Sequence, residues 1–559
     1  MYAGNPKEQA VHLKIQKRKG RQYLSVVQNY RENGTTKTRT VETIGYADAY
    51  EGEYDDPIEH FRAYVAELNE REAEGNAKVE LRFSRDAQIG DTDAPAMRLG
   101  SAVALGCLDA LGVKQFFNAR CSHEHFPHAA GRIFEMLATE RMMHVASKRE
   151  SWERRGAFPR ACAFSFENVY AALVCFARHD AQLTRAMRVA CENIRPYDRS
   201  CGYLACAPFV FSPTTDVHPA GPQNDGAGTA GSTTHESARE THWMCMLMDA
   251  EGIPLDYQLV EGEPDAHALA ELASWGRREH GLQRVVVIAG RLSHMEDAML
   301  ALSAQGDGFV LYEPIHAGST LAEWASATQG YVRSEKGTYR IKSRTRTVSV
   351  GEDGALGEPS SESDGTQSQN DQVDADGNSG ANENATTNDA VSIAGKAGAS
   401  DHATLGISLT IKEVVLRSQG YACTITSETR LSAARIFNLF RELWRLTEPF
   451  QVMEADFSPM PYPVPHADHI RAHFLVCYAA FMALRMLRWR TNWQYNAAGM
   501  ADALLHMEGM HLQQNWYLFN YRTPVTDLIE EACDIPVARR LRTPADVRSA
   551  ITSTCKAFG

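Results

Sequence analysis

The chain has no Cys-x-x-Cys pair and no regular spacing among its twelve cysteines. Scattered cysteines of this kind are typical of reduced thiols rather than of a disulfide framework. Residues 1–20 show no secretory signal, so we expect a cytoplasmic protein. The most apolar stretch, 474–489, is interrupted by Arg485 and Arg488 and is too short to span a bilayer. It predicts a core helix and no membrane partner.

Charge is segregated along the chain. The formal net charge is −13 at pH 7, yet residues 351–404 alone hold eleven Asp and Glu against one lysine, Lys396. Residues 11–40 hold eight Lys and Arg against Glu32, and a second basic block, 333–347, has Glu335 as its one acid. Basic segments beside a near-neutral body favour a polyanionic partner more than the acidic average suggests.

The order of secondary structure predicts an α/β fold with an RNase H-like core. A strand is expected at 202–211, followed by a hairpin at 242–262, a helix at 266–280, a strand at 284–289, a helix at 293–304 and a strand at 308–314. Closer to the N-terminus, 22–47 predicts two strands joined by an Asn-Gly turn. Asp56 before Pro57 predicts the N-cap of a helix.

The remaining segments complete the predicted organisation. Residues 351–404 are rich in Gly, Ser, Asn and Asp, a composition that cannot bury enough surface to offset ordering entropy, so a disordered acidic insert is expected. The predicted domains are a basic N-terminal hairpin plus helix (1–80), a helical module (95–195), the first part of the core (200–314), a β-rich insertion (315–428) that contains the insert, a helical completion of the core (429–495) and a C-terminal helical region (496–559).

Five ordered blocks carry a family resemblance. They are "YLSVVQNYRENGTTKTRTVETIGYAD" (23–48), "HVASKRESWERR" (144–155), "LMDAEGIPLDYQLVEGEPDAHAL" (247–269), "GYACTITSETRLSAARIFNLFRELWRL" (420–446) and "HIRAHFLVCYAAFMAL" (469–484). Together they resemble a bacterial insertion-sequence transposase of the DDE class, in the superfamily named after insertion sequence four. The second block resembles a Ser-Lys element of that family, and the third its Asp-x-x-Gly-Ile-Pro hairpin.

The resemblance implies phosphodiester hydrolysis and strand transfer at transposon ends, with two Mg²⁺ ions held by two Asp and one Glu. The first Asp position falls on Ala205 and the second on Gly290. The positions of the family's Tyr, Arg, Glu, Lys signature fall on Phe440, Leu443, Thr447 and Glu454. All three metal-ligand positions are therefore substituted. No cofactor is expected, and Mg²⁺ is implied for an active homologue.

Other carboxylates lie near these positions in the sequence. Glu448 adjoins Thr447, but one helical step turns its side chain by about 100°. Asp297 is expected about two turns into the helix after Gly290, and Asp216 and Asp225 fall in the Gly-rich loop 212–234. We expect a core that cannot assemble the two-metal site. The alternative is an active enzyme whose carboxylates are misplaced in this alignment.

Several polar residues have structural explanations. Asp249 and Asp265 are expected as turn and helix N-cap residues. His466, His469 and His473 share one helical face and could hold Zn²⁺ with a fourth ligand, but without a Cys pair a structural role is favoured. The segment "HEHFPH" (123–128) predicts a loop.

Candidate DNA contacts gather mostly at the N-terminus. They are Lys17, Arg18, Lys19, Arg21, Lys37 and Arg39, together with Arg471 in the last block. A solvated edge that blunts sheet-to-sheet pairing is the alternative.

The expected protein is a cleavage-deficient transposase relative. It would bind double-stranded DNA, with element ends as the target, as a homodimer associated with the nucleoid. A third hypothesis is a domesticated DNA-binding or interaction module, in which the acidic insert competes with DNA for the basic hairpin. Deleting 351–404 would then tighten DNA binding at low salt, and unchanged affinity would contradict it.

Overall fold

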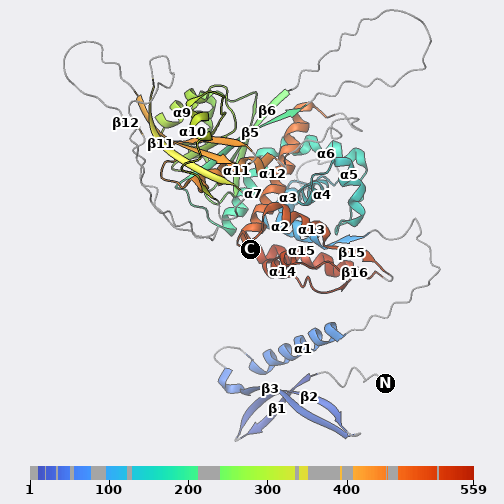
Figure 1. The fold of residues 1–559 in the computed structure, drawn as a ribbon. Helices are drawn as coiled ribbons and strands as arrows, with labels where there is room; N and C mark the ends of the chain where they lie inside the picture. The colour runs from blue at the N-terminus through green and yellow to red at the C-terminus, as the bar shows by residue number, and fades with distance from the viewer. Residues whose placement is uncertain are drawn as a thin grey trace, which may run out of the picture. The chain divides into compact units, whose positions relative to one another are not determined.

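The structure is a computed structural model of the 559-residue chain. It describes residues 11–18, 20–32, 35–50, 56–76, 96–121, 129–211, 240–333, 339–350, 391–392, 407–418, 420–447, 450, 464–512 and 515–559. The chain forms two compact units, Met1–Ile89 and Gly90–Gly559, which are described separately (Figure 1). The loop expected at 123–128 and nearly all of the acidic segment 351–404 lie outside the described residues.

The N-terminal unit is a three-stranded antiparallel meander with one helix. Its elements are β1 (Val11–Arg18), β2 (Arg21–Glu32), β3 (Thr35–Tyr46), the 3₁₀ turn η2 (Ala47–Tyr50) and α1 (Pro57–Asn76). Asp56 accepts hydrogen bonds from the backbone N–H groups of Ile58 and Glu59, at 2.9 and 3.1 Å, which confirms the predicted N-cap. The sequence predicted only the second and third strands, because the basic composition of 11–18 obscured the alternation of its apolar residues.

The second unit is built on a ten-stranded sheet, with the order β10-β11-β13-β14-β9-β8-β5-β6-β7 and β12 paired with β13. The strands are β5 (Gly202–Phe211), β6 (Glu240–Met248), β7 (Pro254–Glu261), β8 (Val285–Ala289), β9 (Gly308–Glu313), β10 (Val332–Arg333), β11 (Arg340–Val350), β12 (Val391–Ser392), β13 (Ile407–Arg417) and β14 (Tyr421–Thr426). β5, β8 and β9 run parallel, and the other pairs are antiparallel.

Helices cover both faces of this sheet. α8 (Ala266–His280) and α9 (Met295–Ala304) pack on one face, and α11 (Ala433–Thr447) packs on the other against β5, β8 and β9. The short α10 (Thr320–Ser326) contributes Leu321 and Ala325 to a smaller cluster with Val415 and Cys423. The helix predicted at 266–280 is confirmed, and the helix predicted at 293–304 begins two residues later.

A helical layer continues from the face that carries α11. Its members are α2 (Leu99–Ala110), α3 (Val113–Cys121), α4 (Ala130–Met143), α5 (Lys148–Glu153), the 3₁₀ turn η3 (Arg154–Ala157), α6 (Phe166–Arg178), α7 (Asp180–Ile194), α12 (His466–Arg490), α13 (Ala497–His506), α14 (Pro524–Cys533) and α15 (Pro544–Phe558). α15 packs closely on α2, so the chain's C-terminal region and its early helices form one body.

The C-terminal region is not purely helical, which corrects the prediction for 496–559. β15 (Glu508–His511), β16 (Tyr517–Phe519) and β17 (Leu541–Arg542) form a small antiparallel sheet with β4 (Met97–Arg98). The pairing partner for β15 comes from about 410 residues earlier in the chain. A local sequence pattern cannot reveal such pairing.

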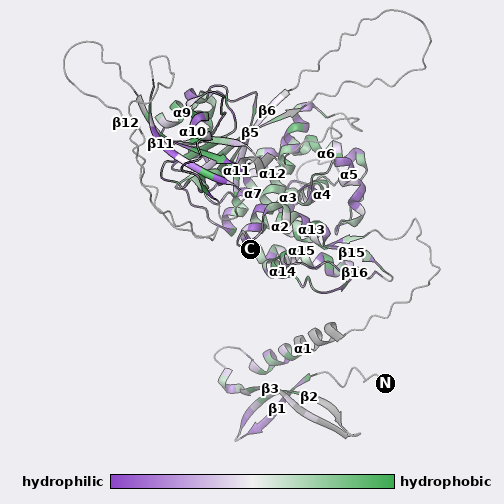
Figure 2. Cartoon of the chain, viewed as in Figure 1, coloured by the Kyte–Doolittle hydropathy of each residue, from purple (hydrophilic) through white to green (hydrophobic). Residues whose placement is uncertain are grey.

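α12 is the central helix of the helical layer. It has 25 residues, and by length and composition it could cross a membrane, but 94% of its most apolar window is buried inside the protein. The apolar run 474–489 is part of this longer helix. The prediction of a core helix is confirmed by the burial. Figure 2 shows the contrast between the hydrophobic central strands and the hydrophilic strand β11.

Candidate active site and nucleic-acid interface

The structure brings two of the family-matching positions together. Ala205 in β5 pairs with Ile288 in β8, and Cys206 pairs with Ala289, so Gly290 follows directly at the carboxyl end of β8. α11, which ends at Thr447 and contains Leu443, packs against both strands. Two neighbouring parallel strands and one helix therefore hold these positions, as a shared site would require.

The surface between α11 and the sheet is apolar at these positions. Ala205, Ile288 and Val310 are each at most 1% exposed and belong to the same core cluster as Ile436 and Phe440 of α11. The Phe440 ring stacks on Tyr312, with 6.0 Å between centroids. Phe440 therefore fills the helix–sheet interface as a packing residue, and Ala205 lies in a dry environment.

Gly290 has a different environment from Ala205. A Cβ atom built on Gly290 would meet no heavy atom within 4 Å, and the glycine is only partly buried. There is thus room for a side chain at the second position, while the first is enclosed. Core side chains therefore enclose Ala205, whereas Gly290 has open space beside it.

Asp297 does not lie on the surface that holds Ala205. The sequence placed it two turns into the following helix, but α9 begins at Met295, so Asp297 lies in its first turn. That helix packs through Met299 and Leu302 on the sheet face opposite α11. The exposed Asp297 side chain consequently does not share the surface of Ala205. Asp216, Asp225, Glu448 and Glu454 lie outside the described residues, as do the side chains of Leu443 and Thr447.

The metal-ligand set expected of an active homologue does not fit here. Ala205 and Gly290 offer no side-chain oxygen to Mg²⁺, which needs hard oxygen ligands. Within the described ranges, no group of three or more His, Cys, Asp or Glu side chains is arranged to hold a metal ion.

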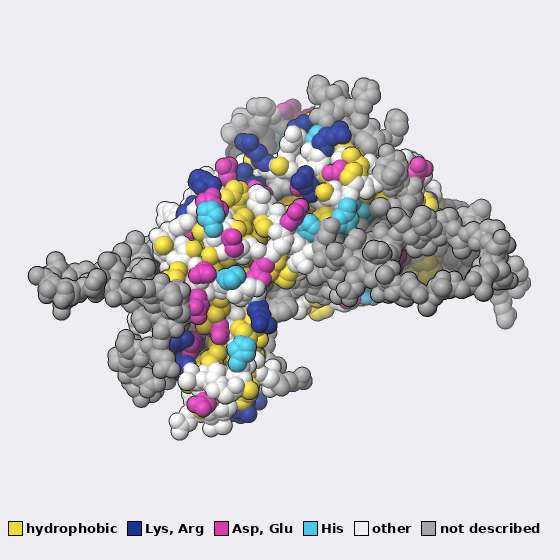
Figure 3. Space-filling model, turned by 90° about the horizontal axis from the view of Figure 1, so that it is seen from above, with side chains coloured by type: hydrophobic (Ala, Val, Ile, Leu, Met, Phe, Trp, Pro, Cys, Tyr) yellow, Lys and Arg dark blue, Asp and Glu magenta, His cyan; other side chains and the backbone are white. Residues whose placement is uncertain are grey.

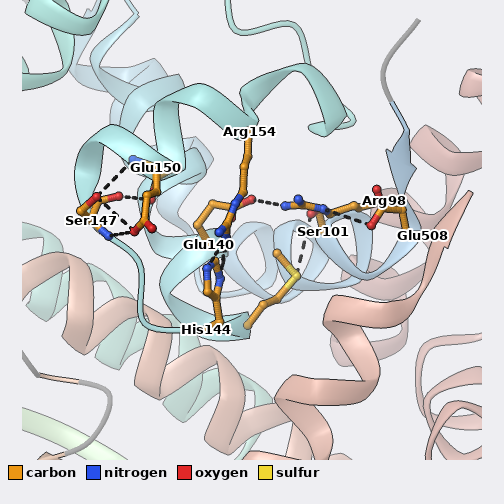
Figure 4. Close-up of polar contacts among 10 residues, drawn as sticks. Arg98, Ser101, Glu140, His144, Ser147, Glu150, Arg154 and Glu508 are labelled. Carbon is orange, nitrogen blue, oxygen red and sulfur yellow. Dashed lines mark hydrogen bonds and ion pairs between the residues drawn. The ribbon is translucent and has the colours of Figure 1, made fainter. Parts of the chain in front are cut away.

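The Ser-Lys element forms a helix cap. Ser147 caps α5, and its Oγ accepts a hydrogen bond from the Glu150 N–H at 3.2 Å (Figure 4). The Ser147 backbone N–H and hydroxyl donate to Glu150 Oε2 at 2.8 and 3.1 Å. These reciprocal hydrogen bonds form a capping box, so Ser147 and Glu150 fix the start of α5.

A buried ion-pair network lies beside this cap. Glu140, with a side chain 3% exposed, accepts a hydrogen bond from Arg98 Nη1 at 2.7 Å, and Arg154 Nη1 lies 3.9 Å from its other oxygen (Figure 4). Burial raises the pKa of Glu140, and the two arginines oppose that rise. Burial also lowers the pKa of His144, as do Arg154 and Arg98. A neutral His144 can then accept the hydrogen bond that Arg154 offers. The network ties α4, β4 and η3 together.

Other polar residues of the sequence analysis have internal partners. Asp249 Oδ1 accepts from the Glu251 and Ile253 N–H groups, each at 2.9 Å, and Asp265 caps α8 by accepting from Ala268 at 2.8 Å. The predicted turn and N-cap roles are confirmed.

The three histidines of α12 do not gather around a described metal site. His469 is fully buried with its ring edge-on to Tyr170, at 5.7 Å. His473 Nε2 faces the Phe450 carbonyl oxygen at 3.3 Å, and burial lowers the pKa of His473 well below its usual value. His473 also lines a cavity of about 20 Å³ with Lys148 and Arg141, which has room for about one water molecule.

Three cations of the second basic block are engaged within the fold. Glu413 of β13, 1% exposed, accepts hydrogen bonds from Arg344 Nε at 2.6 Å and Arg346 Nε at 2.7 Å. Lys342 donates to the Ala327 carbonyl oxygen at 2.9 Å and lies over the Trp324 ring. These three cations stabilise the junction of β11, β13 and α10, whereas Arg333 and Arg340 are exposed.

The N-terminal cations are accessible where the structure describes them. Lys17, Arg18 and Arg21 are exposed, and so is Arg471 on α12. Lys37 and Arg39 lie in β3, but their side chains are outside the described part, as is all of Lys19. Tyr23 and Tyr46 were not among the predicted contacts, and their rings lie under the guanidinium groups of Arg18 and Arg21, with 4.1 and 4.3 Å to the ring centroids. The sequence signal for them is the alternation of arginine and tyrosine along adjacent strands, which places Arg18 and Tyr23 on the same face of the sheet.

Surface charge on the face of the molecule drawn in Figure 3 is mixed. Lys and Arg side chains stand among Asp, Glu and hydrophobic side chains rather than in one large patch.

Comparison with known proteins assigns the N-terminal unit. Residues 12–79 match the family model described as IS1634 family transposase, N-terminal domain. A search of curated proteins finds no match to the chain. The matched residues include β1, β2, β3 and α1, in which the exposed cations lie. The match supports an insertion-sequence transposase.

Proposed function

We propose that this chain is a DDE-class transposase relative with an RNase H-like core, which binds DNA and does not cleave it. The observation that carries the proposal is the enclosed, apolar environment of Ala205 at the position of the first metal ligand. A site that lacks this carboxylate and excludes water cannot position a metal ion for attack on a phosphodiester.

The strand arrangement supports the RNase H-like assignment. The order β7-β6-β5-β8-β9 places an antiparallel hairpin beside β5 on one side and two parallel strands on the other. This is the order expected for an RNase H-like sheet. The sheet is extended beyond β9 by β14, β13, β11 and β10. In the sequence these strands lie between β9 and α11, where the β-rich insertion was expected.

DNA binding is proposed from the N-terminal unit. The family match covers 12–79, and Lys17, Arg18 and Arg21 are exposed there. Exposed cations bind phosphates through release of counterions, without the need for a metal. The proposed target is the double-stranded DNA of element ends, held by a homodimer on the nucleoid in the cytoplasm.

A nicking assay tests the proposal. The full chain is incubated with a supercoiled plasmid that carries the ends of the element, in Mg²⁺ or Mn²⁺, and nicked and linear products are separated on a gel. We expect no cation-dependent nicking, while the same preparation retards a duplex of the element end.

Nicking that requires Mg²⁺ and disappears in EDTA would overturn the proposal. A Glu448→Gln variant is the matched control in that case, because Glu448 adjoins the Thr447 position in the sequence. A contaminating nuclease would be unaffected by this substitution, whereas an active centre that uses Glu448 as its third carboxylate would lose activity.

A further inference from the structure

The two faces of the N-terminal sheet carry different side chains. Val11 and Leu13 of β1 pack with Val65 and Tyr64 of α1, so the odd-numbered residues of β1 face that helix. The ladder between β1 and β2 is regular from Val11↔Gln28 to Arg18↔Arg21. Since successive side chains of a strand point to opposite faces, Lys14, Gln16 and Arg18 lie on the face away from α1.

Register extends this second face across all three strands. Gln16 pairs with Tyr23, Arg18 pairs with Arg21, and Tyr23 pairs with Tyr46 of β3. We call the set Lys14, Arg18, Arg21, Tyr23 and Tyr46 the arginine–tyrosine face. Lys17 is exposed as well. Because it alternates in step with Val11, Leu13 and the exposed Ile15, its side chain lies on the other face of the sheet, the one that faces α1.

The arginines of this face are held in place by aromatic rings. The Arg18 guanidinium lies 4.1 Å from the Tyr23 ring centroid and donates to Gln16 Oε1 at 3.2 Å. The Arg21 guanidinium lies 4.3 Å from the Tyr46 ring, which meets Tyr23 edge-on at 5.1 Å. Stacking fixes the planar groups in an exposed position, so little further side-chain entropy is lost when an anion binds.

Asp48 contacts this face among the described residues. It forms a two-point ion pair with Arg21 through Nε and Nη2, which neutralises part of the charge and orients the guanidinium. Lys14 and Arg18 remain as exposed cations on the same side. A sheet surface with exposed, ordered cations suits the phosphate backbone of duplex DNA, which accepts hydrogen bonds from such groups.

We propose that the arginine–tyrosine face is the surface on which the N-terminal unit binds duplex DNA, with Lys14 and Arg18 contacting phosphates and Lys17 facing away. The proposal rests on the DNA binding proposed above and specifies the face that performs it. It adds Lys14 to the contacts expected from the sequence and removes Lys17 from them.

Two lysines of one strand provide a matched test. Lys14→Ala and Lys17→Ala each remove one exposed positive charge from β1, three residues apart and on opposite faces. Binding of the full chain to a fluorescent duplex of the element end is measured by anisotropy over a series of salt concentrations. Each variant is first checked for an unchanged circular dichroism spectrum.

The two variants should differ in salt dependence. For Lys14→Ala we expect the slope of log K against log salt to fall by about one, with affinity about eightfold weaker at about 0.1 M salt. Lys17→Ala should keep the wild-type slope. Arg18→Ala should behave as Lys14→Ala does.

Three outcomes would overturn the inference. Equal losses for Lys14→Ala and Lys17→Ala would mean that net charge alone matters, and no loss for Lys14→Ala and Arg18→Ala would mean that another surface binds. In both cases DNA binding by the wild type would still stand. If the wild-type chain did not bind the duplex, the proposed function itself would fail.

Discussion

An aspartate introduced at Ala205 should strongly destabilise the second unit. Ala205 is fully buried, and its neighbours Ile288, Val310 and Phe440 offer no hydrogen bond to a carboxylate. An uncompensated buried charge costs about 3–5 kcal/mol, and the added volume costs about 1–3 kcal/mol more. We therefore expect Ala205→Asp to lower the free energy of unfolding by about 4–8 kcal/mol at about pH 8.

Ala205→Asn separates charge from volume. The asparagine has nearly the same size but no charge, so the difference between the two variants isolates the cost of ionisation. That difference should shrink as the pH is lowered toward about 4, by about 1.4 kcal/mol per pH unit, because the buried carboxyl becomes neutral. Gly290→Asp should change stability by only about 0.5 kcal/mol, since its side chain would enter open space.

Tryptophan fluorescence during urea unfolding provides the measurement. All eight tryptophans lie after residue 89, so the signal reports the second unit alone. The reasoning would be refuted if Ala205→Asp and Ala205→Asn unfolded at the same urea concentration at all pH values, because the site would then be hydrated. It would also be refuted if Mg²⁺ restored the stability of Ala205→Asp, because further ligands would then converge there.

Three further changes test the packing and electrostatics of the second unit. Asp249→Ala removes two backbone hydrogen bonds and leaves the Arg195 guanidinium without its buried partner, so the urea midpoint should fall by the equivalent of about 3–5 kcal/mol; a loss below about 1 kcal/mol would contradict the assigned role. Burial raises the pKa of Asp180 from 3.8 to about 6. The folded state therefore holds this proton more tightly, and stability should decline by about 3 kcal/mol as the pH rises from about 4 to 6 and then level off. Asp180→Asn should remove that decline in pH-dependent urea titrations while it preserves an acceptor for the Tyr257 hydroxyl, and an unchanged pH profile would contradict the assignment. In Gly100→Ala the new Cβ would lie 1.8 Å from the Leu504 carbonyl oxygen, so the thermal midpoint should drop by several degrees, and a midpoint equal to the wild type would show that α2 and α13 are less closely packed.

Local chemistry in the sequence predicted several features correctly. The turn at Asp249, the N-caps at Asp56 and Asp265 and the buried strand at 285–289 follow from residues next to one another. The hydrogen bonds of the turn and of the two caps close within four positions of the chain, so the sequence carries the whole of these interactions. The strand is indicated by its run of β-branched residues, although its partners β5 and β9 are distant in the sequence. The match of 12–79 to a transposase N-terminal domain supports the coarser part of the resemblance, an insertion-sequence transposase.

Burial and pairing at a distance could not be predicted in this way. Arg344 and Arg346 looked available to a polyanion until β13 placed Glu413 against them, 69 and 67 residues further along the chain. Which face of β1 is covered depends on α1, a helix about 50 residues further along the chain. Only that packing shows that Lys17 lies on the covered side of the sheet and Lys14 on the other.

The positions that the resemblance assigns to metal ligands combine both kinds of information. The sequence alone shows that Ala205 and Gly290 carry no carboxylate. Only the tertiary structure distinguished them, because α11 closes over Ala205 and leaves space beside Gly290. Residue identity is a local property of the chain, whereas the cost of a charge at one of its positions depends on every segment that folds against it.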